Sequence, residues 1–331
     1  MTGTVSNQSE GISGCPPITS GPKRQHYLPR FYLDGFTRDE LLAVYDRDEK
    51  TLRRQTPNNT AVIGHFYTLI DGEGRKRFEL ESHLAEVEAK ASEALRVLIS
   101  GGQLDEQQRA KFSYFVALCV FRTPDLVESV KHLKGELVKT LARFSFSDIA
   151  RTKDILRGSA EAAQSEEQLD EAARGIVEFA QSGKYEVEVE HEWAVATALG
   201  KAADIGGIFV QREWFVFHVE QERDSFVTTD APVTLMTTRR KHLGFYGVGF
   251  GSEDAVVQFP VSQKTMLVMR GLGTTIQHAG LKRELIRRAN IMTVERCKRY
   301  VFGRDIALVS SLVDASRLAG KRWRPKMQIT T

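Results

Sequence analysis

The sequence is short of the residues and patterns that mark most functional classes. Its 331 residues include only three cysteines, Cys15, Cys119 and Cys297, which form no C-x-x-C pair and no even disulfide framework. This usage is typical of a reducing compartment, so we expect a cytoplasmic protein. The chain has no G-x-x-x-x-G-K-S/T, H-E-x-x-H or G-x-S-x-G motif and no Cys/His zinc spacing. These absences exclude the usual P-loop, metalloprotease, nucleophile-elbow and zinc-finger patterns.

Long apolar runs and targeting signals are missing too. The longest apolar run, residues 112–121, falls short of the ~18 residues that cross a bilayer, so it predicts a buried helix and no membrane partner. Residues 1–22 lack the basic start and the apolar stretch of a secretory signal, and their composition predicts a disordered tail.

Charge is nearly balanced over the whole chain but not locally. The formal net charge is +3. Residues 281–331 contain thirteen Lys/Arg and four Asp/Glu, whereas residues 161–192 contain ten acidic and two basic residues. A basic end of this kind is typical of chains that contact nucleic acid or an acidic surface. We therefore consider nucleic acid as a partner of the basic C-terminal region.

Hydrophobic periodicity divides the chain into three parts. A period of two, rich in β-branched and aromatic residues, predicts strands at 41–48, 65–71, 213–220, 225–230, 255–262 and 265–271. Apolar residues recurring every three or four positions predict helices at 79–99, 105–122, 125–144, 160–182, 190–206 and 281–300. The second helix opens with Asp105 and Gln108, a variant of the capping box.

This order predicts an α+β fold. Short N-terminal strands precede a central helical block, and a mainly antiparallel C-terminal sheet carries a late basic helix. We predict a disordered tail at 1–22, one α+β domain at 23–310 with a helical insertion at about 79–206, and a basic C-terminal tail at 311–331.

The most distinctive stretch is QHYLPRFYLDGF, residues 25–36. Its crowded aromatic residues and leucines cannot all face water, and positions 28, 32 and 36 share one helical face. We interpret the stretch as a hydrophobic plug that docks the N-terminus on the body, with Phe31, Tyr32, Leu33 and Phe36 mostly buried.

The plug resembles the signature of the bacterial family catalogued as domain of unknown function 4238, His-Tyr-(Val/Leu)-Pro-x-x-Tyr-Leu-x-x-Phe. The matching residues are His26, Tyr27, Leu28, Pro29, Tyr32, Leu33 and Phe36. The resemblance continues in order through VYDR, FYT, Leu80-Glu81, Val87-Glu88, Arg122-Thr123-Pro124, Trp214, FVTTDAPV (226–233), FPVS (259–262) and Asn290. It covers about residues 25–305 and implies a shared fold without a mechanism.

Two glutamates on the first long helix are candidate site residues. Glu81 and Glu88 are seven residues apart, so both fall on one edge of the apolar stripe. Such a pair could hold a divalent metal or share acid–base work. We favour a structural alternative, in which Arg122 at the end of the next, antiparallel helix reaches one of them and forms a buried ion pair.

His26, Asp230 and Asn290 also have two interpretations each. His26 could act as a general base or ligand, or its ring could tie the plug to a backbone carbonyl. Asp230 could point into a cleft beside Thr228 and Thr229, or it could cap a helix that begins at the following Ala-Pro. Asn290 could close such a cleft or bond a neighbouring loop.

These residues leave two function classes open. In the first, the protein is a hydrolase of a phosphodiester or similar anionic substrate, with a site made by His26, Glu81, Glu88, Arg122 and Asp230. The carboxylates would hold a divalent metal or act as acid and base, Arg122 would stabilise developing charge, and His26 would move a proton. In the second, the protein is a non-catalytic module that binds nucleic acid or a protein. A pocket shared by the five residues would favour the enzyme, and separate internal pairing would favour the module.

Overall fold

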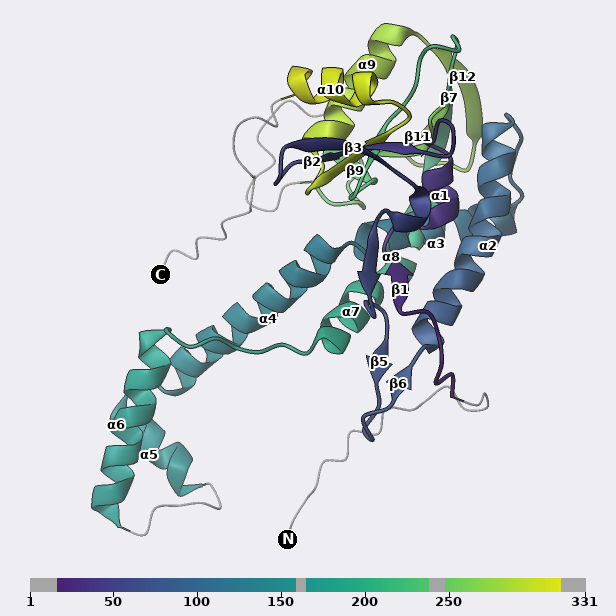
Figure 1. The fold of residues 1–331 in the computed structure, drawn as a ribbon. Helices are drawn as coiled ribbons and strands as arrows, with labels where there is room; N and C mark the ends of the chain where they lie inside the picture. The colour runs from purple at the N-terminus through teal and green to yellow at the C-terminus, as the bar shows by residue number, and fades with distance from the viewer. Residues whose placement is uncertain (1–16, 159–164, 238–247, 317–331) are drawn as a thin grey trace.

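The computed structural model describes residues 17–158, 165–237 and 248–316. Two sheets and their covering helices form a body, from which α4 (Pro124–Ser145), α5 (Ile149–Arg157) and α6 (Glu166–Ser182) extend (Figure 1). We call residues 124–190 the arm. The predicted α+β class is confirmed, with short N-terminal strands, a helical block and a mainly antiparallel C-terminal sheet.

The N-terminal strands frame the plug. β1 (Arg24–His26) pairs with β4 (Val62–Gly64), and β5 (Leu69–Ile70) forms a hairpin with β6 (Lys76–Arg77). The 3-10 helix η1 (Pro57–Asn59) precedes β4. Between these pieces the plug forms only one short helix, α1 (Arg30–Asp34), which starts after Pro29.

The plug is buried as predicted. Tyr32, Leu33 and Phe36 have no exposed surface, and Phe31 is half-buried against Phe115, with ring centroids 5.5 Å apart. The Tyr32 hydroxyl lies 2.6 Å from Thr228 Oγ1 and donates to the Pro260 carbonyl at 2.8 Å. The plug therefore joins the N-terminus to strands almost two hundred residues away.

The helical block begins with a tightly packed pair. α2 (Glu79–Ile99) has the predicted bounds, and α3 (Glu106–Phe121) begins with the predicted capping box, in which Gln108 N donates to Asp105 Oδ1 at 2.7 Å. After the arm, α7 (His191–Leu199) and α8 (Ala202–Val210) return the chain to the body, and α8 packs along α3. The single predicted helix at 190–206 is thus two helices, because the chain turns at Gly200.

The larger sheet has the order β12-β7-β11-β10-β9 and belongs to the C-terminal half. Its strands are β7 (Glu213–Val219), β9 (Thr234–Thr237), β10 (Ala255–Ser262), β11 (Thr265–Arg270) and β12 (Ile276–Leu281). Only β12 runs parallel to its neighbour, β7. β9 and β12 were not predicted, because each lies at an edge and takes its pairing from one distant strand.

The second sheet combines both ends of the chain. Its order is β3-β2-β13-β8, formed by β2 (Leu42–Asp46), β3 (Thr51–Gln55), β8 (Thr228–Thr229) and β13 (Tyr300–Gly303). The sequence pattern predicted separate N-terminal and C-terminal strands, whereas β13 pairs with β2 along its length. Helices α9 (Arg283–Glu295) and α10 (Ile306–Ala315) pack beside this sheet.

The predicted tails lie mostly outside the described residues. Residues 17–22 form no helix or strand, but Ile18 N donates to Glu79 Oε1 at 3.0 Å and Phe78 N donates to the Ile18 carbonyl at 2.9 Å. At the other end, residues 311–315 belong to α10, and residues 317–331 are not described.

One helical stretch among the described residues, His191–Val210, is long and apolar enough to cross a membrane. A third of its window is buried in this fold, and core helices pass the same test, so this is weak evidence. The sequence analysis did not single it out.

Candidate functional site

Arg122 brings together four of the five predicted site residues. Its guanidinium is buried and donates from Nη1 to Glu88 Oε1 at 2.7 Å and from Nη2 to the His26 carbonyl at 2.6 Å. Burial raises the pKa of the Glu81 carboxyl, and this side chain lies close enough to Arg122 for the charge of the guanidinium to oppose that effect. The predicted Arg–carboxylate contact is therefore confirmed, with Glu88 as the partner.

The local fold explains why these residues meet. α2 and α3 pack against each other, so the end of α3 returns to the early part of α2. Pro124, at the first position of α4, cannot extend α3, and Arg122 becomes the residue that caps α3. Its side chain then faces the α2 edge on which Glu81 and Glu88 lie.

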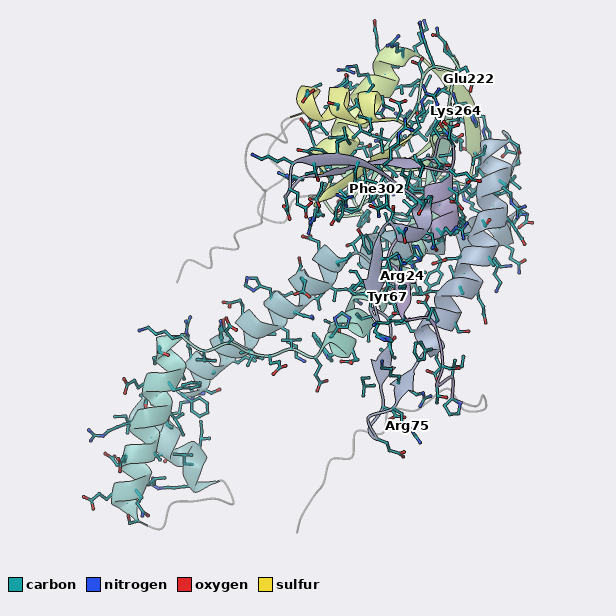
Figure 2. All side chains as sticks on the ribbon, in the orientation of Figure 1. Arg24, Tyr67, Arg75, Glu222, Lys264 and Phe302 are labelled. Carbon is teal, nitrogen blue, oxygen red and sulfur yellow. The ribbon has the colours of Figure 1, made fainter. Side chains whose placement is uncertain are left out.

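The sequence analysis missed a fifth member of the group, Tyr67. Its buried hydroxyl donates to the Arg122 carbonyl at 2.9 Å and accepts from Arg122 Nε at 3.4 Å. The guanidinium carbon also lies 5.5 Å from the Tyr67 ring centroid. Tyr67 lies inside the body (Figure 2), and burial raises its pKa to about 12. The only sequence signal was its place in the FYT segment. We call His26, Tyr67, Glu81, Glu88 and Arg122 the Arg122 cluster.

The cluster leaves few groups free for chemistry. All three guanidinium nitrogens of Arg122 donate to partners in this chain. Although burial opposes its charge, Tyr67 and Glu88 keep the pKa of Arg122 above its ordinary value, so the side chain stays a cation. Three of its five N–H donors are thus used within the chain, as expected of a residue that holds a fold together.

Glu81 and His26 are the two less constrained members. Burial raises the pKa of the Glu81 carboxyl, with the Arg122 charge opposing this effect. Burial lowers the pKa of His26, whose Nε2 is buried with no hydrogen-bond partner among the described residues. Both shifts favour the neutral forms of the two side chains.

Asp230 lies apart from the cluster and holds a different turn. It is buried, and its carboxylate accepts hydrogen bonds from Lys298 N at 2.9 Å and Arg299 N at 2.6 Å, just before β13. No helix begins after it, so the helix-cap interpretation is wrong. Burial raises its pKa to about 6 against the opposing effect of these backbone donors.

Asn290 on α9 makes a similar internal connection. Its side chain is buried, accepts from Val227 N at 3.1 Å and donates to the Ser225 carbonyl at 2.8 Å. Of the two interpretations of Asn290, the bond to a neighbouring loop is the one observed.

Cavities and metal geometry do not unite the predicted residues. Within the described ranges, no group of three or more His, Cys, Asp or Glu side chains could hold a metal ion. A cavity of about 180 Å³ lies where α4 begins, between Cys119, Thr123, Asp125, Ala231 and Lys298. A groove of about 450 Å³ runs along α4, beside Glu186, Val187 and Val189. None of the five candidates lines either space.

The basic late helix is largely solvated. Lys282, Arg283 and Arg288 are exposed, and Arg287 donates to Ser311 Oγ at 3.2 Å. α9 lies at the opposite end of the molecule from α6, so it does not dock on the acidic 161–192 segment (Figure 1). Nucleic-acid binding by this region stays a prediction.

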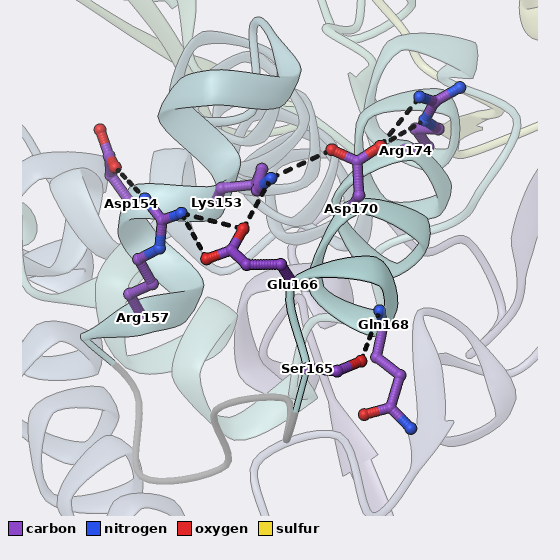
Figure 3. A network of polar contacts seen from close by, with 8 residues as sticks. All are labelled: Lys153, Asp154, Arg157, Ser165, Glu166, Gln168, Asp170 and Arg174. Carbon is purple, nitrogen blue, oxygen red and sulfur yellow. Dashed lines mark hydrogen bonds and ion pairs between the residues drawn. The ribbon is translucent and has the colours of Figure 1, made fainter.

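Charged residues at the tip of the arm pair with one another. Lys153 Nζ lies 3.1 Å from both Glu166 Oε2 and Asp170 Oδ1, and Arg157 Nη2 lies 2.8 Å from Glu166 Oε1 (Figure 3). Arg174 Nη2 binds Asp170 Oδ2 at 2.8 Å. The pairs of Lys153 and Arg157 join α5 to α6, whereas the Arg174 pair lies within α6. Such surface pairs stabilise a fold only modestly.

Comparison with known proteins identifies the family alone. No curated protein and no solved structure matched the chain. One family model, described as "Protein of unknown function (DUF4238)", matches residues 24–306. This range includes the plug, the Arg122 cluster and both sheets, and it covers most of the 331 residues. The chain therefore belongs to the DUF4238 family, as the order of its motifs predicted.

Proposed function

We propose that this protein is a non-catalytic module that binds another protein through its helical arm. The predicted site residues would then serve the body as internal connections, and the exposed surface of α4 would serve the partner. The apolar residues exposed on the arm carry this proposal.

The body supplies the first support. Arg122 and Glu88 bind each other, Asp230 binds backbone amides, and Asn290 binds a loop. These are separate internal pairings in two places, which is the arrangement that favours a module over the hydrolase.

The arm supplies the stronger support. Fourteen large hydrophobic residues are exposed in the described chain, and eight of them lie in the arm, which is about a fifth of the described residues. These eight are Leu133, Leu137, Val138, Leu141, Phe144, Ile149, Ile155 and Phe179. Single exposed apolar residues are ordinary, whereas a concentration of them marks a surface that another molecule covers.

Site-specific crosslinking in cells that make the protein tests the proposal. The photoreactive residue p-benzoylphenylalanine would replace Leu137, which is 56% exposed on α4. The matched control is Leu272, which is 75% exposed on the body. We expect irradiation to give one discrete protein adduct from position 137 and none from position 272, with the adduct identified by mass spectrometry.

Two results would contradict the proposal. Equal labelling from positions 137 and 272 would show random collision. No adduct from any of positions 133, 137 and 141 would show that the arm meets no protein under those conditions. Either result would favour the hydrolase alternative, in which Glu81 and His26 would be tested next as acid and base.

A further inference from the structure

We propose that the occupant of the arm surface is a second copy of this chain, with two α4 helices paired antiparallel about a two-fold axis at Leu137. This inference rests on the proposed function, since it names the protein that the arm binds. Three features of α4 support the pairing: the position of its exposed residues, the symmetry of their spacing and the charges beside them.

The exposed residues of α4 form one continuous stripe. Leu126, Val130, Leu133, Leu137, Leu141 and Phe144 fall within ~80° of one another around the helix at 100° per residue. Val130 is half-buried and packs against the main core, whereas Leu133, Leu137, Leu141 and Phe144 are 55–67% exposed. The stripe thus begins as part of the core and continues into solvent.

The chain covers the other side of α4 and leaves the stripe free. Gly135 is buried, and a Cβ there would lie 3.8 Å from Val187 in the extended segment after α6. Lys131, Gly135 and Lys139 of α4 line the groove beside this segment. Position 135 is about 160° from Leu137 around the helix. The arm therefore has one face for its own chain and an opposite apolar face without a cover among the described residues.

The spacing of the stripe is symmetric about Leu137. Leu133 and Leu141 lie four residues to either side, and Val130 and Phe144 lie seven residues to either side. An antiparallel pair centred on this residue places Leu137 opposite its copy, Leu133 opposite Leu141, and Val130 opposite Phe144. A two-fold interface requires this reciprocity, in which residue i meets j and j meets i.

Charge does not oppose the pairing. Lys134, the basic residue beside the stripe, has its Nζ 3.7 Å from the centroid of the Trp193 ring. Lys131 and Lys139 lie about 120° and 160° from Leu137 around the helix, and they pair with Glu128 and Glu136 at 2.9 and 3.2 Å. Two α4 helices can therefore approach without a row of unpaired like charges between them.

The size of the surface suits a dimer of modest strength. α4 has 22 residues, a length of ~33 Å at 1.5 Å per residue. Standard protein interfaces use roughly 20–30 residues from each partner. Only the face with the apolar stripe can contribute, so this surface falls below that range, and we expect a dimer that dissociates on dilution.

Sedimentation and light scattering of the purified full chain test this inference. We expect the wild-type chain to be a dimer at micromolar concentration, and Leu137→Glu to weaken association at least 100-fold, since two opposed carboxylates would lie on the axis. Leu272→Glu on the body is the matched control and should remain a dimer.

Cysteine crosslinking then tests the antiparallel register. In a Cys15→Ser background the remaining cysteines, Cys119 and Cys297, are buried. We expect Leu137→Cys to form an intermolecular disulfide on mild oxidation. Leu133→Cys alone should not, but it should crosslink when mixed with Leu141→Cys. Efficient crosslinking of Leu133→Cys with itself would overturn the antiparallel arrangement.

The outcomes separate this inference from the proposed function. A chain that stays monomeric at all concentrations, yet gives a cellular adduct with a different protein from position 137, would overturn the second copy and leave the binding module. A dimer that Leu137→Glu does not weaken would place the interface elsewhere and overturn the inference. An absence of both dimer and adduct would overturn both proposals.

Discussion

The Arg122 cluster and the arm meet at one helix boundary and use their side chains in opposite ways. In the cluster, a charged residue is almost fully buried and all its nitrogens are engaged within the chain. Beyond Pro124, Leu133, Leu137 and Leu141 are more than half exposed, and ion pairs lie at the surface. The polar residues face inward on one side of the boundary, and the apolar residues face outward on the other.

This contrast changes which residues deserve functional tests. In the sequence, His26 stands out by its aromatic surroundings, and Glu88 and Arg122 by their helical positions, but their contacts are those of a structural core. The leucines of α4 look ordinary in the sequence, because an apolar stripe on a helix normally faces the core of its own chain. Only the fold shows that this stripe leaves the body.

The largest effect should come from Arg122→Ala. Removing the guanidinium leaves Glu88 and the His26 carbonyl without this partner, whereas the Tyr67 hydroxyl keeps its bond to the Arg122 carbonyl. Breaking a buried ion pair in this way costs about 3–5 kcal/mol. We expect a large fall in Tm by differential scanning calorimetry. Arg174→Ala in the arm is the matched control, because its pair with Asp170 is exposed and contributes little to stability. Equal Tm values for the two variants would erase the contrast between cluster and arm.

Tyr32→Ala should destabilise the body by about 3–5 kcal/mol, as aromatic truncation in a core does. The ring is fully buried and stacks on Phe259 with centroids 5.2 Å apart. Tyr32→Phe keeps the ring but removes the buried hydroxyl that donates to the Pro260 carbonyl, which costs about 1–3 kcal/mol. Chemical denaturation of both variants measures the two contributions. A Tm unchanged in Tyr32→Ala would show that the plug does not hold the body together.

Much of the fold could be predicted from sequence because helices and caps depend on neighbouring residues. The bounds of α2 and the capping box at Asp105 follow from local spacing. β13 and β3 could not be predicted, since these short strands depend on pairing with β2, up to about 250 residues away for β13. The arm could not be separated from the body either, because its periodicity equals that of a core helix.

The candidate site was predicted in part for the same reason. Glu88 and Arg122 could be paired because helix geometry and one antiparallel return fix their positions. Tyr67 and the backbone partners of Asp230 come from distant segments, and their residue types carry no spacing signal. Sequence reasoning therefore found the ionic pair of the Arg122 cluster and missed its aromatic neighbour.

Substitutions of Glu88 and Glu81 test which of the two carboxylates stabilises the buried charge of Arg122. Glu88→Gln should cost about 1–3 kcal/mol, since it weakens a charged hydrogen bond to a buried guanidinium. Glu81→Gln should leave stability at pH 7 unchanged or raised, because burial raises the pKa of Glu81 and so disfavours its charged form. Parallel denaturation curves measure both variants. A loss in Glu81→Gln as large as that in Glu88→Gln would show that Arg122 is shared between the two carboxylates.

A fall in pH should stabilise the body around Asp230 and destabilise the tip of the arm. The pKa of Asp230 is about 6 in the fold and 3.8 in the unfolded chain, so its contribution to stability falls as the pH rises from about 4 to above 6. At the arm tip, Arg157 and Lys153 hold the pKa of Glu166 below its usual value, and Lys153 and Arg174 do the same for Asp170. Their stabilisation is present at neutral pH and is lost as the pH falls through the folded-state values.

Hydrogen exchange at pH 7 and pH 4, corrected for intrinsic rates, measures this difference. Amides of α5 and α6 should lose protection at the lower pH, whereas amides of β13 should keep or gain it. In Asp230→Asn the gain at β13 should disappear. Loss of protection in both regions together would show that arm and body unfold as one unit.

The smallest effect on the monomer should come from Leu137→Gln. Because Leu137 is 56% exposed and touches no core, the change should shift the unfolding free energy of the monomer by no more than about 0.5 kcal/mol. Leu98→Gln is the matched control, since Leu98 on α2 is fully buried and the same substitution there should cost several times more.

The dependence of Tm on protein concentration gives a second measurement on Leu137→Gln. A ligand that binds only the folded state raises Tm with its concentration, and a second copy of the chain is such a ligand. The Tm of the wild-type chain should therefore rise with protein concentration, and the Tm of Leu137→Gln should not. A rise of equal size in both would show that α4 is exposed for a reason other than pairing with its own copy.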